Sequence, residues 1–208
     1  MFLIVTRNFP PEIGGMQILM GGLSESLINH GPVKVFAYEA PGSASFDKNS
    51  SMNIERIKGL KLFRKYRKAN LVNDFINKNS NIRALIADHW KSLELIKKEN
   101  LKRTKVFCLL HSKEINHKVG SSINKRLIKS TDKADFIIAN SNFTKKLAID
   151  VGINPSKIHV IFPGIKKPKN IENLFKLKAE QIYGDSFPKI ITVARFEKRK
   201  GVKLHELQ

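Results

Sequence analysis

The 208-residue sequence has one cysteine, no long apolar run and no glycine-rich dinucleotide motif, and each absence excludes a class of protein. A single cysteine cannot form an intramolecular disulfide, so nothing in the chain requires an oxidising compartment. The apolar start, MFLIV, is too short for a signal peptide, and no other run approaches membrane-spanning length. No G-x-G-x-x-G motif follows this first run, which argues against a nicotinamide-dependent dehydrogenase. We therefore expect a cytoplasmic protein.

Negative charge is scarce as well. The chain has 38 lysines and arginines against 18 aspartates and glutamates, a formal net charge of +20. Such an excess favours an anionic partner, such as nucleic acid, phospholipid headgroups or a phosphorylated substrate. Bias toward AT-rich codons is the alternative explanation, because Asn and Ile are abundant beside Lys. We find no helix-turn-helix, zinc-ligand or base-stacking pattern, so nucleic acid is not the expected partner.

Apolar segments of strand length alternate with segments of helical period along most of the chain. In the first helical segment Met16, Met20, Leu23 and Leu27 fall on one face, and Gly31 is suited to end it. Strands this apolar, separated by helices, indicate an α/β fold with a doubly wound, Rossmann-like parallel sheet. The expected strands are 2–6, 33–38, 52–57, 82–88, 105–111, 135–141 and 157–163; the expected helices are 16–30, 71–77, 92–100, 123–130 and 142–151, with a loop over 41–51.

The alternation also predicts the domain organisation. It closes at Pro163-Gly164, so we expect a Rossmann-like domain over 1–165 and a linker with a short helix over 166–188. Residues 189–208 begin a strand-loop-helix unit again, which predicts the first elements of a second, incomplete Rossmann-like domain.

Gly14 and Gly15 lie in the turn between the first strand and the helix that opens near Met16. This turn falls at the carboxyl edge of the sheet, where ligands bind in open α/β folds. Glycines let the backbone approach a ligand closely, and a helix N-terminus presents unpaired N–H groups to an anion. A tight turn without a ligand explains the same two residues, so both interpretations remain open.

Four motifs carry a resemblance to a known family. They are "PPEIGGMQ" near the start, "HSKE" at 111–114, "ANSNFTKKLAIDVGINPSKIHVIFPGI" at 139–165 and "VARFEKRKG" at 193–201. In this order they resemble retaining GT-B glycosyltransferases of family 4, over nearly the whole chain. The resemblance implies two Rossmann-like domains facing across a cleft, the first holding the acceptor and the second a nucleotide-diphosphate sugar. It implies transfer of the sugar to an acceptor hydroxyl with retained configuration and without a metal cofactor.

The resemblance also implies a set of residues that bind the donor. Gly14 and Gly15 match the family's glycine-rich loop, whose backbone approaches the donor diphosphate. Arg195 and Lys200 match the basic pair that neutralises this diphosphate as the bond to the sugar breaks.

Further residues follow expected strands and are assigned by the same resemblance. His111 matches the histidine near the transferred sugar, where an imidazole hydrogen-bonds hydroxyls or relays a proton, and it is the catalytic candidate. Asp88 and His89, after another strand, and Glu114, the acid of the "HSKE" segment, are candidates for the acceptor side. Lys113 stands where relatives often carry another histidine or a small residue.

The stretch 56–68 interleaves cations with Leu60, Leu62, Phe63 and Tyr66. Such a segment can bind an anionic bilayer surface, and many related transferases act on lipid-linked or cell-envelope acceptors at the inner membrane. A solvated helix face that covers its own core has the same pattern, so the sequence leaves both possibilities open.

A complete relative continues for about another domain, with a paired-Glu motif that grips the donor. We therefore expect the chain as given to have little or no transferase activity, with catalysis belonging to a longer parent. The alternative is a non-catalytic module that binds an acceptor or a membrane surface. The sugar, the nucleotide and the acceptor are not identified by the sequence.

Overall fold

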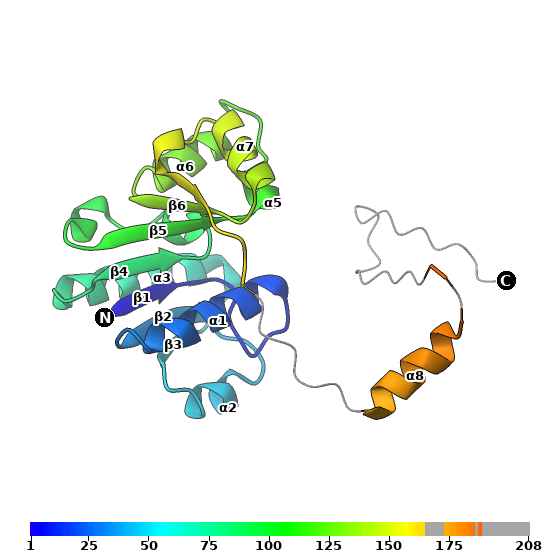
Figure 1. Ribbon diagram of the computed structural model, residues 1–208. Coiled ribbons are helices and arrows are strands. Elements are labelled where there is room, and N and C mark those ends of the chain that lie inside the picture. The colour runs from blue at the N-terminus through cyan, green and yellow to red at the C-terminus, as the bar shows by residue number, and fades with distance from the viewer. Residues whose placement is uncertain (165–172, 186, 189–208) are drawn as a thin grey trace. The chain divides into compact units, whose positions relative to one another are not determined.

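The computed structural model describes residues 1–164, 173–185 and 187–188, and Figure 1 shows their fold. The chain divides into two compact units, Met1–Gly164 and Ile165–Gln208. In the second unit, α8 spans Asn173–Tyr183, within the segment where a short helix is predicted. The predicted start of a second Rossmann-like domain, 189–208, lies outside the described residues and stays a prediction.

The first unit is built on one seven-stranded parallel sheet, ordered β3-β2-β1-β4-β5-β6-β7 (Figure 1). Phe2 of β1 pairs with Val33 of β2 on one side and with Ala84 of β4 on the other. The predicted doubly wound parallel sheet is confirmed. The strands are β1 (Phe2–Val5), β2 (Val33–Tyr38), β3 (Asn53–Ile57), β4 (Ala84–Ala87), β5 (Lys105–Leu110), β6 (Phe136–Ala139) and β7 (Ile158–Val160).

Helices cover both faces of the sheet because alternate strand residues project to opposite sides. Leu3 and Val5 belong to one apolar cluster, together with residues of α3, α4 and α6, whereas Ile4 belongs to a second cluster with residues of α1. Nearly every residue of β1, β2 and β4 is buried, which accounts for their apolar sequences; the one charged residue in them, Lys34 of β2, pairs with Glu55. The helices of this unit are α1 (Gly15–Ile28), α2 (Ser43–Lys48), α3 (Lys61–Lys78), α4 (Trp90–Leu93), α5 (Ser112–Ile115), α6 (Ser122–Thr131) and α7 (Asn142–Asp150).

The helix expected over 92–100 is broken. The structure has α4 and a separate 3-10 helix, η1 (Lys98–Leu101), with a second such turn, η2 (Pro155–Lys157), later in the chain. Between α4 and η1, the Lys133 ammonium donates hydrogen bonds to the carbonyls of Leu93, Glu94 and Ile96 at 2.7–3.0 Å. These contacts satisfy carbonyls that a continuous helix would bond internally. The expectation failed because the partner lies far away in the sequence.

The structure also differs from the sequence predictions at three other helices. α3 begins ten residues before its predicted start at 71, because its first turns are exposed and carry no buried apolar period. α2 lies inside the predicted loop 41–51, and α5 was not predicted; both are single short helices.

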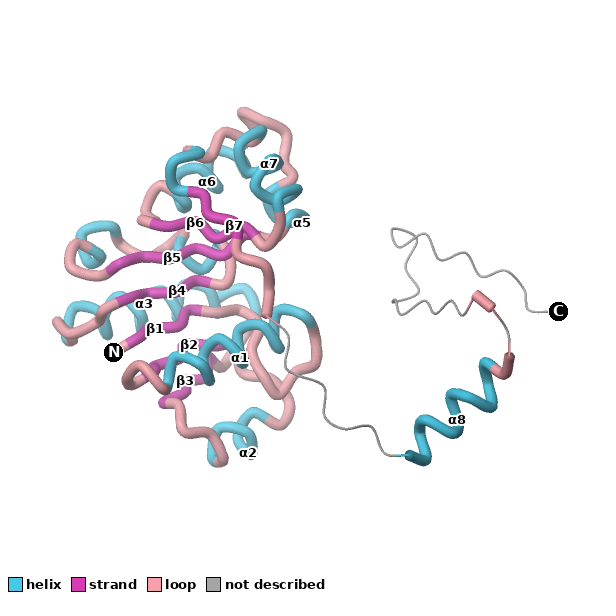
Figure 2. Tube along the Cα trace, in the orientation of Figure 1, coloured by secondary structure: helices cyan, strands magenta, loops and turns pink. Residues whose placement is uncertain are grey.

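The strand order reverses between β1 and β4, which makes their carboxyl ends the topological switch point of the sheet. β2 and β3 lie on one side of β1, while the chain returns through α3 to β4 on the other side. Figure 2 shows the loops that follow β1, β4 and β5 at the same end of the sheet. In open α/β folds ligands bind in the crevice outside this point.

Two adjacent glycines of α1 provide a test of how the loop after β1 packs. A Cβ at Gly21 would lie 2.7 Å from Pro10 Cγ, whereas a Cβ at Gly22 would meet nothing within 4 Å. We expect Gly21→Ala to lower the free energy of unfolding by about 1–3 kcal/mol through overpacking. Gly22→Ala, the matched control, should raise it by up to about 1 kcal/mol through helix propensity. Denaturant unfolding measures both; equal effects would contradict the contact.

Candidate functional site

Asp88 follows β4 at the switch point, and its exposed fraction is 0%. Its carboxylate accepts hydrogen bonds from the Thr6 hydroxyl (2.9 Å), the Arg7 backbone N–H (2.9 Å) and the Ser92 hydroxyl (2.7 Å). Both carboxylate oxygens are thus engaged by groups of the chain itself. Asp88 fixes the end of β1 against the start of α4, and its predicted contact with an acceptor stays a prediction.

Lys68 of α3 completes this buried network. Its ammonium donates to the Thr6 carbonyl at 2.9 Å and to Ser92 Oγ at 3.3 Å, and it lies 4.6 Å from the centre of the Tyr38 ring. Burial lowers the pKa of Lys68 to about 8, against the opposing effect of Asp88. At neutral pH the network therefore holds a cation beside a buried carboxylate, and it ties α3 to the switch point.

His111 follows β5 at the same edge of the sheet. Its Nε2 lies 3.3 Å from the Asp88 carbonyl oxygen, and its backbone N–H donates to the Glu114 carboxylate. Burial lowers the pKa of His111 and raises the pKa of Glu114 to about 7. The imidazole is therefore neutral at neutral pH and carries one donor and one acceptor nitrogen. The structure thus brings three predicted residues, His111, Glu114 and Asp88, into one cluster.

His89 and Trp90, at the start of α4, differ in their exposure to solvent. The His89 ring accepts a hydrogen bond from the Lys91 backbone N–H at 2.9 Å, so it caps α4, and it remains partly exposed. The Trp90 ring is fully buried, and its Nε1 donates to the Glu114 carbonyl at 3.0 Å. Of this pair, only His89 reaches the surface, and its predicted place on the acceptor side stays a prediction.

We expect His89 to make the fold less stable in acid. Burial lowers its pKa to about 3, so below pH 6.5 the unfolded chain takes up a proton that the folded chain does not. Stability should fall as pH decreases from 6.5 to 5, and His89→Asn, which keeps a capping side chain, should remove about 1–2 kcal/mol of this loss. The raised pKa of Glu114 acts in the opposite direction, but wild type and variant share it.

Unfolding free energies at pH 7 and pH 5 measure this difference. Exposed His30→Asn supplies the matched control. A wild type and a His89→Asn variant with parallel pH dependence would show that the ring is not held neutral.

Gly14 and Gly15 lie at the N-terminus of α1, as predicted from the sequence. Gly14 has φ 172°, an extended conformation open to any residue, and a Cβ there would meet only the end of the flexible Gln17 side chain. A Cβ at Gly15 would meet nothing within 4 Å. Neither glycine is required by backbone conformation or by packing against another element, and Gly15 leaves open space at the helix N-terminus.

Two predicted donor contacts, Arg195 and Lys200, lie outside the described residues and stay predictions. Within the part of the chain that is described, no group of three or more His, Cys, Asp or Glu side chains could hold a metal ion. No helix among these residues is long and apolar enough to cross a membrane.

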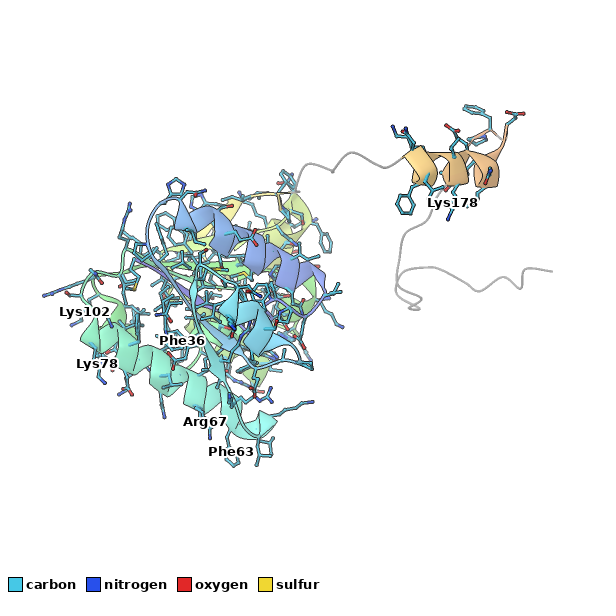
Figure 3. The ribbon with its side chains drawn as sticks, turned by 90° about the horizontal axis from the view of Figure 1, so that it is seen from below. Phe36, Phe63, Arg67, Lys78, Lys102 and Lys178 are labelled. Carbon is cyan, nitrogen blue, oxygen red and sulfur yellow. The ribbon has the colours of Figure 1, made fainter. Side chains whose placement is uncertain are left out.

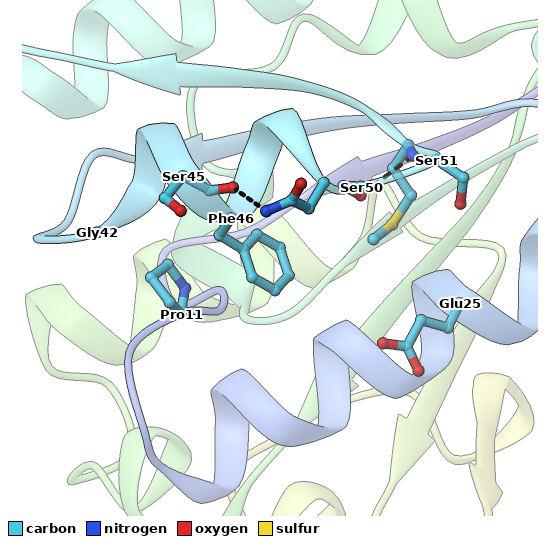
Figure 4. Close-up of a pocket in the computed structure, with 9 residues that line it drawn as sticks. Pro11, Glu25, Gly42, Ser45, Phe46, Ser50 and Ser51 are labelled. Carbon is cyan, nitrogen blue, oxygen red and sulfur yellow. Dashed lines mark hydrogen bonds between the residues drawn. The ribbon is translucent and has the colours of Figure 1, made fainter.

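A surface pocket of about 530 Å³ lies beside α1 and α2 (Figure 4). It shares no residue with the Asp88 network and has no cation among the residues that line it, so it does not suit an anionic donor. Its lining residues are Pro11, Glu25, Gly42, Ser45, Phe46, Asn49, Ser50, Ser51 and Met52.

Sequence reasoning missed Thr6, Lys68 and Ser92, which hold the network together. A signal existed for Lys68, because Lys68, Val72 and Ile76 are spaced by four on the buried face of α3. A lysine at a core position of an amphipathic helix needs a buried partner. Thr6 and Ser92 carry no comparable signal, since hydroxyl residues are common at strand and helix ends.

Comparison with known proteins gives a family match. The sequence model of glycosyltransferase family 4 matches residues 13–167. A curated relative from Klebsiella pneumoniae, an uncharacterized 41.2 kDa protein in the cps region, is 32% identical over 95 residues, which are 45% of this chain and 25% of that protein.

Solved structures with the same fold include Anabaena Alr3699/HepE in complex with UDP, with a TM-score of 0.64 and 15% identity, covering 89% of this chain and 51% of that one. The apo form of the lipopolysaccharide outer core galactosyltransferase WaaB has a TM-score of 0.57 and 15% identity, with coverage of 83% and 50%. The chain thus spans about half the length of these structures.

Proposed function

The chain belongs to glycosyltransferase family 4, and from this premise we propose that it forms the acceptor-side domain of an enzyme that transfers a sugar from a nucleotide-diphosphate sugar to an acceptor hydroxyl. The observation that carries the proposal is that Gly15 and His111 follow β1 and β5, whose carboxyl ends lie at the same edge of the sheet. Gly15 leaves open space at the N-terminus of α1, and His111 presents a neutral imidazole after β5. Each matches a family motif.

The geometry supports different roles for the N-terminus of α1 and for His111. Unpaired N–H groups at the start of α1 suit the donor diphosphate, and no acidic residue in the first turn opposes an anion. The His111 ring suits a hydroxyl of the transferred sugar, since Nε2–H faces the Asp88 carbonyl and leaves Nδ1 as an acceptor. Glu114 and the Asp88 network hold the ring in place. We propose that the anomeric configuration is retained and that no metal takes part.

The remaining donor contacts are proposed to come from Arg195, Lys200 and a further domain. HepE is described in complex with UDP and spans about twice the matched length. We therefore propose that the 208-residue chain alone has little or no transferase activity. The acceptor is proposed to be a cell-envelope glycan or a lipid-linked precursor, in keeping with the lipopolysaccharide acceptor in the name of WaaB. The proposed location is cytoplasmic, on the inner face of the membrane.

The first measurement is the coding sequence that follows codon 208, read in all frames for an α/β continuation with a paired-Glu motif. Any longer product and the 208-residue chain are then assayed for nucleoside diphosphate release from UDP-, GDP- and ADP-sugars with a lipid extract as acceptor. We expect release by the longer product alone and an α-configured product from an α-linked donor. Turnover by the 208-residue chain would contradict its proposed dependence on further residues.

The second candidate is a non-catalytic module that binds an acceptor or a membrane surface. It would be favoured if no continuation exists and the chain binds acceptor lipid without binding any nucleotide sugar.

A further inference from the structure

The first turns of α3, together with the residue before them, form an exposed apolar surface, which we name the α3 tip (residues 60–67). Leu60, Leu62, Phe63 and Tyr66 are 74%, 79%, 60% and 50% exposed. The buried positions of α3 begin only at Lys68. The tip therefore does not cover the core of its own domain. This excludes the explanation that the apolar residues of the tip belong to a solvated helix face covering its own core.

The tip is also strongly cationic. The segment 58–67 contains Lys58, Lys61, Arg64, Lys65 and Arg67 and no acidic residue. Within the described chain the one acidic side chain paired with these cations is Glu39, 3.5 Å from Lys58.

The guanidinium groups of the tip stiffen it without losing charge. Arg64 donates to the Gly59 carbonyl at 2.6 Å, and Arg67 to the Lys58 carbonyl at 2.7 Å. Backbone carbonyls do not neutralise these cations.

Both ends of the stretch 56–68 point inward, in contrast to its middle. Arg56 binds Asp47 at 2.7 Å and the Pro10 carbonyl at 2.6 Å, and Lys68 lies in the Asp88 network. Figure 3 shows Phe63 at the end of α3, pointing away from the body of the domain, with Arg67 beside it. The tip is thus anchored on both sides and held outward.

We propose that the α3 tip is a docking surface for an anionic phospholipid bilayer. Exposed leucine, phenylalanine and tyrosine suit the boundary between headgroups and acyl chains, and the surrounding cations suit anionic headgroups. This charge complementarity distinguishes a bilayer from an apolar protein partner. Because Lys68, one residue beyond the tip, contacts the end of β1, docking holds the switch point near the membrane surface.

This inference goes beyond the proposed transfer reaction and is tested without donor or acceptor. The 208-residue chain is sedimented with vesicles of phosphatidylcholine alone and of phosphatidylcholine with phosphatidylglycerol, at low and at high salt. We expect binding to the anionic vesicles that weakens with salt, and little binding to the neutral ones. Lys61→Glu with Lys65→Glu should weaken binding about 25-fold or more, at roughly fivefold for each cation removed.

Matched controls separate the tip from the general positive charge. Lys78 and Lys102 are exposed at the opposite end of α3 (Figure 3), so Lys78→Glu with Lys102→Glu makes the same charge change elsewhere. Phe63→Ser should weaken binding about tenfold, whereas Phe143→Ser, at a residue of α7 that is 68% exposed, should not.

Several outcomes would overturn the docking surface. Equal losses in the tip and control variants would show that diffuse net charge accounts for binding. Absence of vesicle binding, or binding of duplex RNA in its place, would also overturn it. None of these results bears on whether the longer protein transfers a sugar.

Discussion

Replacing His111 with alanine is expected to lower the rate of sugar transfer by about 10²-fold to 10⁴-fold in the longer protein that carries this domain. The ring lies at the carboxyl edge of the sheet, 3.3 Å from the Asp88 carbonyl oxygen, and burial keeps it neutral. Loss of the imidazole removes a positioned hydrogen-bond acceptor from the reacting sugar. Steady-state release of nucleoside diphosphate measures the effect.

His111 also precedes α5 as its capping residue, so a structural role must be separated from a chemical one. His111→Asn serves this purpose, because asparagine is a preferred N-cap but lacks an imidazole. We expect both His111 variants to lose activity equally. Retention of activity in His111→Asn would show that capping of α5 is what the histidine supplies. His30→Ala, at an exposed histidine, is the control for a general effect of removing a histidine.

Asp88→Ala is expected to lower the free energy of unfolding by about 3–5 kcal/mol. The change leaves the Lys68 ammonium buried without a compensating carboxylate, and it removes the acceptor for Thr6, Arg7 and Ser92. Breaking a buried charged network by removing one member is costly because the other charge stays desolvated. Denaturant unfolding followed by fluorescence measures the effect, since the sequence has a single tryptophan, Trp90, which is buried next to the network.

The exposed Asp74 of the same helix as Lys68 provides the matched control, and Asp74→Ala should change stability by less than about 0.5 kcal/mol. In a double-mutant cycle, Asp88→Ala combined with Lys68→Met should cost less than the sum of the two single changes, because it leaves no unpaired charge. An Asp88→Ala loss under 1 kcal/mol, or strict additivity, would contradict a coupled network.

The elements that sequence reasoning predicted well are those whose signal is local. The central strands β1, β2 and β4 are recognisable because they are buried on both faces and are therefore largely apolar, and α1 because its apolar residues repeat on one face. The first half of α3 was missed for the converse reason, since its exposed Leu62 and Phe63 do not repeat on a buried face. The break after α4 was missed because the capping ammonium of Lys133 comes about 40 residues later.

The candidate site was predictable to a similar extent. Motif resemblance selected Gly14, Gly15, His111 and Glu114, and the parallel sheet brings the strand ends that precede them to one edge. The motif resemblance could not show that Asp88 is fully buried while the adjacent His89 is partly exposed. That difference depends on how β4 ends against the residues after β1.

By itself the sequence determined the fold class, the family motifs and the positive charge, because burial of apolar strands and helix faces imposes periods that are visible along the chain. Only the tertiary structure decided which polar and charged side chains lie inside. Asp88 accepts a hydrogen bond from Thr6, which lies 82 residues away in the sequence, and Lys68 donates one to the Thr6 carbonyl, 62 residues away. A buried charge depends on such distant partners, since desolvation must be offset in three dimensions. For the same reason Lys68 enters the core while its neighbours Lys65 and Arg67 remain on the surface.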